Sequence, residues 1–220
     1  MADWLVIFDC DGVLVDSERL NVRTWTGMMR DAGVDFTEAD AVEAFVGKAY
    51  KDNRVTLTEL TGAVPDPEWE RAWRAEFLRS QEQLEPIAGA GEAVAAVREL
   101  GLEVCVASGS LLAAIGTKLG RTGLDGYFPE AVRFSAEQVE HGKPAPDVFL
   151  LAARELGFAP ERCVVVEDSR AGIEAAVAAG MPVVGYRSDL TPTGWLEGAD
   201  AVIDEMADLP SVISRLTALG

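Results

Sequence analysis

The sequence is poor in the residues that most often bind transition metals or form disulfides. Its 220 residues include three cysteines and one histidine. Cys10, Cys105 and Cys163 lie far apart, within apolar runs such as LEVCVA and RCVVVE, and none of their spacings is typical of a metal or redox motif. We therefore expect the cysteines to be small core residues. His141 precedes a Gly-Lys-Pro stretch, where we expect an exposed side chain.

Positive charge is also scarce. The chain carries 37 Asp and Glu against 19 Lys and Arg, a formal net charge of -18. Such a surface repels nucleic acids and anionic membranes, so we expect neither as a partner. A small anionic substrate is compatible with this net charge. A few cations and a metal ion placed at the binding site outweigh the electrostatic field of more distant acidic residues. The acidity slightly favours a monomer over a homodimer.

Long apolar runs are absent as well. No stretch approaches the roughly 20 apolar residues of a membrane-spanning helix. The apolar run in MADWLVIFD is too short for a signal peptide and follows no basic segment, so we expect a cytoplasmic location. About half of the residues are hydrophobic (49%), which predicts a packed globular protein with one core, or a core with a smaller insert.

Strand and helix patterns alternate in the second part of the chain. β-branched runs predict strands at 102–107, 162–167, 182–186 and 199–203, after a first strand at 4–9. Helices are predicted between them at 91–100, 146–157 and 169–180. Pro146 and Ser169 start the second and third, and a glycine ends each of the three. This alternation predicts an α/β fold with a doubly wound parallel sheet covered on both faces.

The segment after the first strand follows a different pattern. Residues 16–84 show only helical periodicity, with helices predicted at 18–32, 38–45, 52–60 and 67–84. The simplest explanation is an inserted, all-helical domain. We therefore predict a catalytic core formed by residues 1–15 and 86–220 and a helical domain formed by residues 16–85.

Two acidic residues end the first strand. Side chains alternate along a strand, so Asp9 and Asp11 point to one side and Cys10 to the other. Open α/β sheets bind ligands at the carboxyl ends of their strands, which makes this pair a candidate site. The alternative is that both are ordinary turn residues, since Asp and Gly commonly end strands.

Polar residues follow three further predicted strands or loops. Ser108, Gly109 and Ser110 offer hydroxyl and backbone N–H groups to a phosphate, although a helix cap is the simpler interpretation for Ser110. Lys143 places a cation in another loop, where an isolated lysine is usually a solvated surface charge. Glu167 and Asp168 end the predicted strand at 162–167. Adjacent carboxylates there suit a hard cation such as Mg²⁺, and the alternative is that Asp168 caps the next helix.

The combined charge of these residues predicts a metal ion. Asp9, Asp11, Glu167 and Asp168 bring up to four negative charges to one sheet edge, and a phosphate monoester adds nearly two more. Such a site requires neutralisation by Lys143 and a divalent cation. The alternative, that these polar residues are only turn residues, helix caps and surface charges, requires four unrelated coincidences at strand ends.

Four segments, in this order, resemble the haloacid dehalogenase superfamily of phosphotransferases. They are FDCDGVLVDS, VASGS, GKPAPDVF and VVVEDSRAGIEAAVAAGM, and they extend from residue 8 to residue 181. The helical block at 16–84 looks like the small cap domain of that family. Within the superfamily, the chain looks most like the group of β-phosphoglucomutase and its phosphatase relatives.

The resemblance implies a role for each matching residue. Asp9 would be the nucleophile that carries the phosphoryl group, and Asp11 would be the general acid and then the general base. The pKa of Asp11 should then be raised relative to that of Asp9. Ser108 and Lys143 would hold the phosphoryl oxygens. Magnesium would be bound by Asp9, the backbone carbonyl of Asp11 and Asp168, with Glu167 as a direct or indirect contributor.

The resemblance favours a magnesium-dependent phosphatase acting on small phosphorylated metabolites such as sugar phosphates. Asp11 distinguishes the chain from dehalogenases, which lack a second Asp at that position. A sugar phosphomutase is the main alternative, but its cap histidine corresponds to Asn21 here, and its cap loop differs at Gly47 and Lys48, which we expect to contact substrate. Phosphonate hydrolysis through a cap lysine and a non-catalytic binding module are weaker alternatives.

Overall fold

The structure is a computed structural model that describes residues 3–46, 50–64 and 66–218. The chain divides into two compact units. The first comprises residues 1–16 and 85–220, and the second comprises residues 17–84. Within the described ranges, no helix combines the length and the apolar character that crossing a bilayer requires.

The larger unit is built on a parallel sheet. Its described residues form six strands in the order β3-β2-β1-β4-β5-β6, and every neighbouring pair is parallel. The strands are β1 Leu5–Phe8, β2 Glu103–Ser108, β3 Arg133–Ser135, β4 Cys163–Glu167, β5 Val183–Tyr186 and β6 Ala201–Ile203. The predicted α/β fold with a parallel sheet is confirmed.

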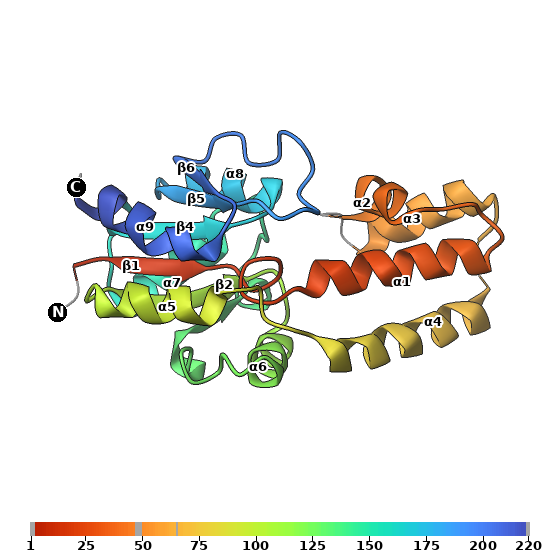
Figure 1. The fold of residues 1–220 in the computed structure, drawn as a ribbon, viewed down its shortest axis with the longest axis horizontal. Coiled ribbons are helices and arrows are strands. Elements are labelled where there is room, and N and C mark those ends of the chain that lie inside the picture. The colour runs from red at the N-terminus through yellow and green to blue at the C-terminus, as the bar shows by residue number, and fades with distance from the viewer. Residues whose placement is uncertain (1–2, 47–49, 65, 219–220) are drawn as a thin grey trace. The chain divides into compact units, whose positions relative to one another are not determined.

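Helices cover both faces of this sheet. They are α5 Ala90–Glu99, α6 Leu112–Arg121, α7 Asp147–Leu156, α8 Arg170–Ala178 and α9 Leu209–Ala218, with short 3-10 turns at Glu130–Val132, Ala136–Gln138, Pro160–Arg162 and Met206–Asp208. Figure 1 shows α5 and α9 together on one face, opposite α7 and α8. Alternate residues of the central strands pack into the buried cluster under α7 and α8, among them Leu5 and Ile7 of β1.

The strand sequences explain which strands can be recognised. β1 (LVIF) and β4 (CVVVE) are buried along their whole length, because helices cover both faces of a parallel sheet. The short edge strand β3 (RFS) was not predicted, since three residues carry no periodic pattern. The three cysteines are buried and free, as expected.

The starts of the core helices follow local chemistry. Ser169 caps α8, because its side chain accepts a hydrogen bond from the Gly172 backbone N–H at 3.0 Å. This confirms Ser169 as the cap and excludes that role for Asp168. Helix α7 follows Pro146 and ends at Gly157, whose φ of 79° lies in the left-handed region that favours glycine.

The smaller unit is helical. Its elements are α1 Ser17–Asp31, α2 Glu38–Phe45, α3 Tyr50–Thr61, α4 Pro67–Ser80 and a 3-10 turn at Gln81–Gln83. Helix α4 is therefore shorter than the predicted 67–84. Thr37 and Asp40 form a reciprocal capping box at the start of α2. The indole N–H groups of Trp69 and Trp73 on α4 both donate to the Asp31 carboxylate on α1, at 2.6 and 3.1 Å.

The two chain segments that border the insert are hydrogen-bonded to each other. The Asp16 N–H donates to the Glu85 carbonyl at 2.9 Å, and Val15 forms an antiparallel bridge with Pro86. The Ile87 N–H donates to the Leu14 carbonyl at 3.0 Å. The chain thus leaves the larger unit and returns to it at two points that are hydrogen-bonded to each other.

A glycine in α8 should be essential for packing against β4. A Cβ on Gly172 would lie 1.8 Å from the Glu167 carboxyl group, so Gly172→Ala should lower the free energy of unfolding by about 1–3 kcal/mol. Gly120→Ala on α6 is the matched control, because its Cβ would meet no atom within 4 Å, and it should be neutral or stabilising by up to about 1 kcal/mol. Urea denaturation measures both, and equal effects would contradict the close contact.

Candidate active site

The centre of the sheet marks the candidate site. β1 lies between β2 and β4, where the direction of strand order reverses, and the carboxyl ends of such strands form ligand-binding crevices. The Asp9 N–H extends the pairing with β4 by donating to the Val166 carbonyl at 3.0 Å. A tight turn follows, in which the N–H groups of Leu14 and Val15 both donate to the Cys10 carbonyl at 3.0 Å. Asp11 lies on this turn.

A buried lysine holds two buried carboxylates at this position. The Lys143 ammonium donates to Asp9 Oδ1 at 2.6 Å, to Glu167 Oε1 at 2.7 Å and to the Ala107 carbonyl at 3.2 Å. The side chains of Lys143, Asp9 and Glu167 are only 10%, 8% and 1% exposed. The ammonium also lies 4.7 Å from the centre of the Phe149 ring. Lys143 is therefore a structural part of the site and no solvated surface charge.

Burial changes the acidity of this group of residues. Desolvation raises the pKa of Asp9 from 3.8 to about 7, Lys143 opposes this rise, and Glu167 and Asp11 add to it. Burial alone would lower the pKa of Lys143, but Asp9 and Glu167 together outweigh it and hold that pKa above its ordinary value. The structure thus raises the pKa of Asp9, the residue expected to be the nucleophile, because Asp9 is deeply buried. The expectation of a raised pKa at Asp11 stays a prediction.

Glu167 organises its surroundings with both of its oxygens. Oε1 accepts from Lys143, and Oε2 accepts from the Asp168 N–H at 2.9 Å, the Ser169 N–H at 2.8 Å and the Ser169 hydroxyl at 2.9 Å. The carboxylate therefore links Lys143 to the start of α8. Both oxygens of Glu167 therefore have partners within the protein.

Asp11 has a separate set of partners. Its Oδ1 accepts from Lys118 of α6 at 2.5 Å, and its Oδ2 accepts from the Ser110 hydroxyl at 2.7 Å. Lys118 also donates to the Ser110 oxygen at 2.9 Å. The interpretation of Ser110 as a helix cap is wrong, because α6 begins after Leu111 without a side-chain cap and the Ser110 hydroxyl contacts Asp11 instead.

The predicted phosphate-binding residues end β2. Ser108 is buried, and its hydroxyl oxygen accepts from the Ser110 N–H at 3.1 Å. Lys143 contacts the carbonyl of the preceding residue, Ala107, which brings this strand end next to Asp9. The Gly109 Cα is open, since an added Cβ would meet nothing within 4 Å. The predicted residues Asp9, Ser108, Lys143 and Glu167 are therefore adjacent.

Asp168 lies against the turn that carries Asp11. A Cβ on Gly12 would be only 2.0 Å from Asp168 Oδ2, and Gly12 has a φ of 78°. Within residues 3–46, 50–64 and 66–218, no three His, Cys, Asp or Glu side chains converge into a ready-made metal cage. The carboxylates of Asp9 and Asp168 and the nearby backbone carbonyl of Asp11 are nonetheless hard oxygen donors of the kind that Mg²⁺ prefers. The donor set thus fits a divalent cation.

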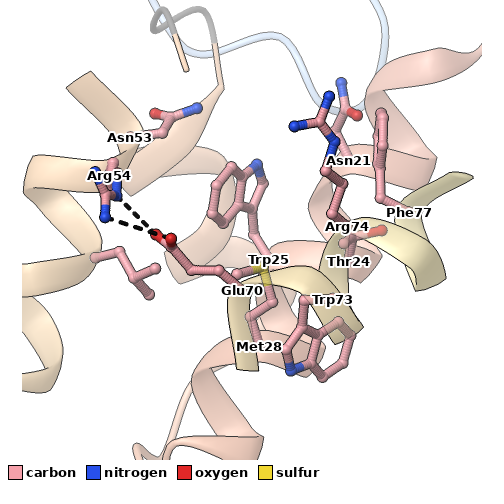
Figure 2. Close-up of a pocket in the computed structure, with 11 residues that line it drawn as sticks. Asn21, Thr24, Trp25, Met28, Asn53, Arg54, Glu70, Trp73, Arg74 and Phe77 are labelled. Carbon is pink, nitrogen blue, oxygen red and sulfur yellow. Dashed lines mark hydrogen bonds and ion pairs between the residues drawn. The ribbon is translucent and has the colours of Figure 1, made fainter. Parts of the chain in front are cut away.

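The helical domain contains a pocket of its own. The pocket has a volume of about 380 Å³ and is lined by residues of α1, α3 and α4, drawn in Figure 2: Asn21, Thr24, Trp25, Met28, Asn53, Arg54, Leu57, Glu70, Trp73, Arg74 and Phe77. The half-exposed Arg54 side chain pairs with Glu70 at 2.7 Å. Asn21 donates to Glu18 at 3.1 Å and lines the pocket, whereas Gly47 and Lys48 lie outside the described residues.

Lys118 was missed at the sequence level. It lies on an amphipathic helix, between the buried residues Ile115 and Leu119, yet its side chain is only 17% exposed. Helix α6 follows the polar residues that end β2, and Lys118 lies beside the apolar face of this helix. A lysine in such a position indicates a buried ion pair. Its partner, Asp11, is 107 residues away and could not be identified from local pattern.

His141 is exposed, as expected, and its side-chain Nδ1 lies 3.3 Å from Asp147.

The chain belongs to the haloacid dehalogenase-like hydrolases, whose family model matches residues 5–180. This confirms the resemblance seen in the four motifs and shows that the chain is a hydrolase. Membership implies a divalent metal ion, typically Mg²⁺.

Similar proteins include several phosphatases. The chain is 35% identical over 187 residues to fructose-1-phosphate phosphatase of Escherichia coli, covering 83% of this chain and 95% of that protein. It is 31% identical over 186 residues to 6-phosphogluconate phosphatase of E. coli, covering 84% and 82%. It also matches Suppressor of Quenching 1 of Arabidopsis thaliana with 34% identity over 201 residues, but spans only 19% of that longer protein.

A solved structure agrees over nearly the whole chain. A haloacid dehalogenase family hydrolase from Deinococcus radiodurans, crystallised with bound phosphate and sodium, has a TM-score of 0.83 and 28% sequence identity, and the match covers 98% of this chain and 97% of that chain. The fold of a parallel α/β core with an N-terminal helical insertion is thereby shown.

The raised pKa of Asp9 predicts how stability depends on pH in the presence of a chelator. The folded protein keeps a proton on Asp9 that the unfolded chain has already released between its ordinary pKa of 3.8 and about 7. The unfolded state then binds fewer protons, so the free energy of unfolding should fall as pH rises through this window.

Urea denaturation in EDTA, from about pH 4 to about pH 8, tests this sign when wild type is compared with Asp9→Asn, which lacks the titration. The stability of wild type relative to the variant should decrease with rising pH. A relative stability that is constant or that increases would contradict the proposed burial effect.

Proposed function

We propose that the protein is a magnesium-dependent phosphatase that hydrolyses small phosphorylated sugars or sugar acids through an aspartyl-phosphate on Asp9. One observation supports this most directly. Asp9, a buried carboxylate at the end of β1, is held by Lys143 at 2.6 Å, and a second carboxylate with its own partners follows two residues later. This separates a nucleophile from an acid/base at the position where the sheet binds ligands.

Asp9 would attack the phosphorus atom with the oxygen that Lys143 does not hold. The bond from phosphorus to the substrate oxygen breaks, and Asp11 donates a proton to the departing alkoxide. Asp11 then accepts a proton from a water molecule, which attacks the phosphorus atom of the aspartyl-phosphate and releases inorganic phosphate. Lys143 and the Ser108 hydroxyl are placed to stabilise the charge of the transferring group.

The metal ion would be held by the carboxylates of Asp9 and Asp168 and by the backbone carbonyl of Asp11. When bound, it would supply positive charge that lets an anionic substrate approach anionic carboxylates. Glu167 would support this set indirectly, because its hydrogen bonds to the N–H groups of Asp168 and Ser169 hold the strand end that carries Asp168.

Two facts support the substrate class. The relatives of known activity named above act on fructose 1-phosphate and 6-phosphogluconate, both phosphorylated sugar derivatives. The pocket of the helical domain is lined by Trp25 and Trp73, whose apolar rings suit the C–H surface of a sugar, and by the cation Arg74, which suits a hydroxyl or a carboxylate. We propose that this domain selects the organic part of the substrate, together with Gly47 and Lys48.

Asp9→Asn should retain its fold and lose turnover by several orders of magnitude, because the amide cannot form the aspartyl-phosphate. The measurement is phosphate release with Mg²⁺, together with acid-quench detection of phosphoprotein. Asp125→Asn, a substitution of an exposed aspartate in the same unit, is the matched control and should behave like wild type. Comparable activity in Asp9→Asn would remove this residue from the mechanism.

A panel of phosphomonoesters should show phosphate release that depends on Mg²⁺ and stops when a chelator is added. Fructose 1-phosphate, 6-phosphogluconate and β-glucose 1-phosphate belong in the panel, with the formation of glucose 6-phosphate followed in parallel. We expect the highest kcat/KM among the sugar derivatives and no isomerisation. Isomerisation without phosphate release would identify a mutase, and a complete lack of activity would favour a binding module.

A further inference from the structure

Lys118, Ser110 and Asp11 form a closed ring of three contacts. Lys118 donates to Asp11 Oδ1 at 2.5 Å and to the Ser110 oxygen at 2.9 Å, and the Ser110 hydroxyl donates to Asp11 Oδ2 at 2.7 Å. Each carboxylate oxygen thus has a partner of its own, and the two partners also contact each other. A carboxylate held at both oxygens cannot rotate without breaking a charge-assisted hydrogen bond.

The surrounding structure holds this ring in place. The Ser135 hydroxyl at the end of β3 donates to the Ser110 carbonyl at 2.7 Å, which ties Ser110 to the sheet. On α6, Lys118 lies in sequence beside the buried residues Ile115 and Leu119. Asp11 begins the turn after β1 and forms a bridge with Val15, and the contacts of its two side-chain oxygens fix the direction of its carboxylate.

The Lys118–Asp11 pair differs from the surface ion pairs of the molecule. The two side chains are 17% and 24% exposed, whereas Arg187 and Asp204 in a surface pair are 57% and 62% exposed. Surface pairs contribute little, because solvent screens them and the side chains lose rotational freedom. The partly buried pair keeps its geometry better, which is the property that proton transfer at Asp11 requires.

We propose that Lys118 is a positioning residue which, together with Ser110, holds the Asp11 carboxylate in the orientation needed to give a proton to the leaving group and to take one from water. This inference rests on the proposed function. In the contacts described here, Lys118 touches neither Asp9 nor Asp168. Of Asp11, whose backbone carbonyl is a predicted metal ligand, it touches only the carboxylate, and it acts through that carboxylate.

The choice of substrate separates the step that needs Asp11 from the step that does not. p-Nitrophenolate is a weak base and leaves without a proton, so the first burst of product from p-nitrophenyl phosphate reports attack by Asp9 alone. An alkyl phosphate needs a proton on its leaving oxygen. Hydrolysis of the aspartyl-phosphate needs a base with either substrate.

The test compares Lys118→Met, which keeps the length of the side chain, with Arg121→Met, which removes one positive charge from an exposed position of the same helix. Ser110→Ala is a second variant that removes the other partner of Asp11. Stopped-flow and steady-state kinetics with Mg²⁺, thermal unfolding and Mg²⁺ titration by calorimetry are measured for each.

For Lys118→Met we expect kcat on an alkyl phosphate to fall by about 10- to 100-fold, with KM within about 3-fold of wild type. The rate of the p-nitrophenolate burst should stay at the wild-type value, while its amplitude rises as aspartyl-phosphate accumulates. Mg²⁺ affinity should be unchanged. Ser110→Ala should shift the same quantities in the same direction, and Arg121→Met should match wild type.

Two results would overturn the inference. Lys118→Met could behave like Arg121→Met in every assay, which would make the ion pair irrelevant to catalysis. Alternatively, burst rate, KM and thermal stability could change together, which would reduce Lys118 to a structural role. A wild-type protein that releases no phosphate with Mg²⁺ would instead overturn the proposed function, and this inference with it.

Discussion

The site depends on one ammonium group, that of Lys143, which is shared by Asp9 and Glu167 with little access to solvent. Burying a lone charge costs several kcal/mol, so Lys143 and the two acids stabilise one another in this position. They come from three separate segments, the end of β1, the end of β4 and the loop before α7. Their pairing therefore joins the central strands to α7, and the second oxygen of Glu167 extends the connection to the start of α8.

The two carboxylates that we propose as catalytic groups, Asp9 and Asp11, are distinguished by their environments rather than by their chemistry. Asp9 is almost fully buried and shares its lysine with a second acid, so desolvation dominates its pKa. Asp11 is more exposed and has a lysine and a hydroxyl to itself. Burial alone would lower the pKa of Lys118, but Asp11 raises it above its ordinary value, which keeps that partner charged. Two neighbouring residues of the same type thus have different environments, as the different roles proposed for them require.

Much of the fold and part of the site could be predicted from the sequence. β1 and β4 are continuous apolar runs, and the acids that follow them must lie at one sheet edge, because parallel strands end on the same side. The alternation of residues along the strands does not reveal side-chain contacts. It could not show that Glu167 uses both oxygens to support Lys143 and Ser169, or that Ser110 contacts Asp11. The three residues of β3 were missed, and so was Lys118, because its role depends on a partner distant in the chain.

The chain passes from the larger unit into the helical insert after residue 16 and returns at residue 85. The proximity of these two points has a consequence for how such a chain can change in evolution. To the larger unit, residues 17–84 are equivalent to a surface loop whose two ends are already hydrogen-bonded. The entropic cost of closing a loop rises only with the logarithm of its length, so inserts of different size can occupy this position at little expense to the sheet. The helical insert and the strand ends of the larger unit can therefore diverge independently in evolution.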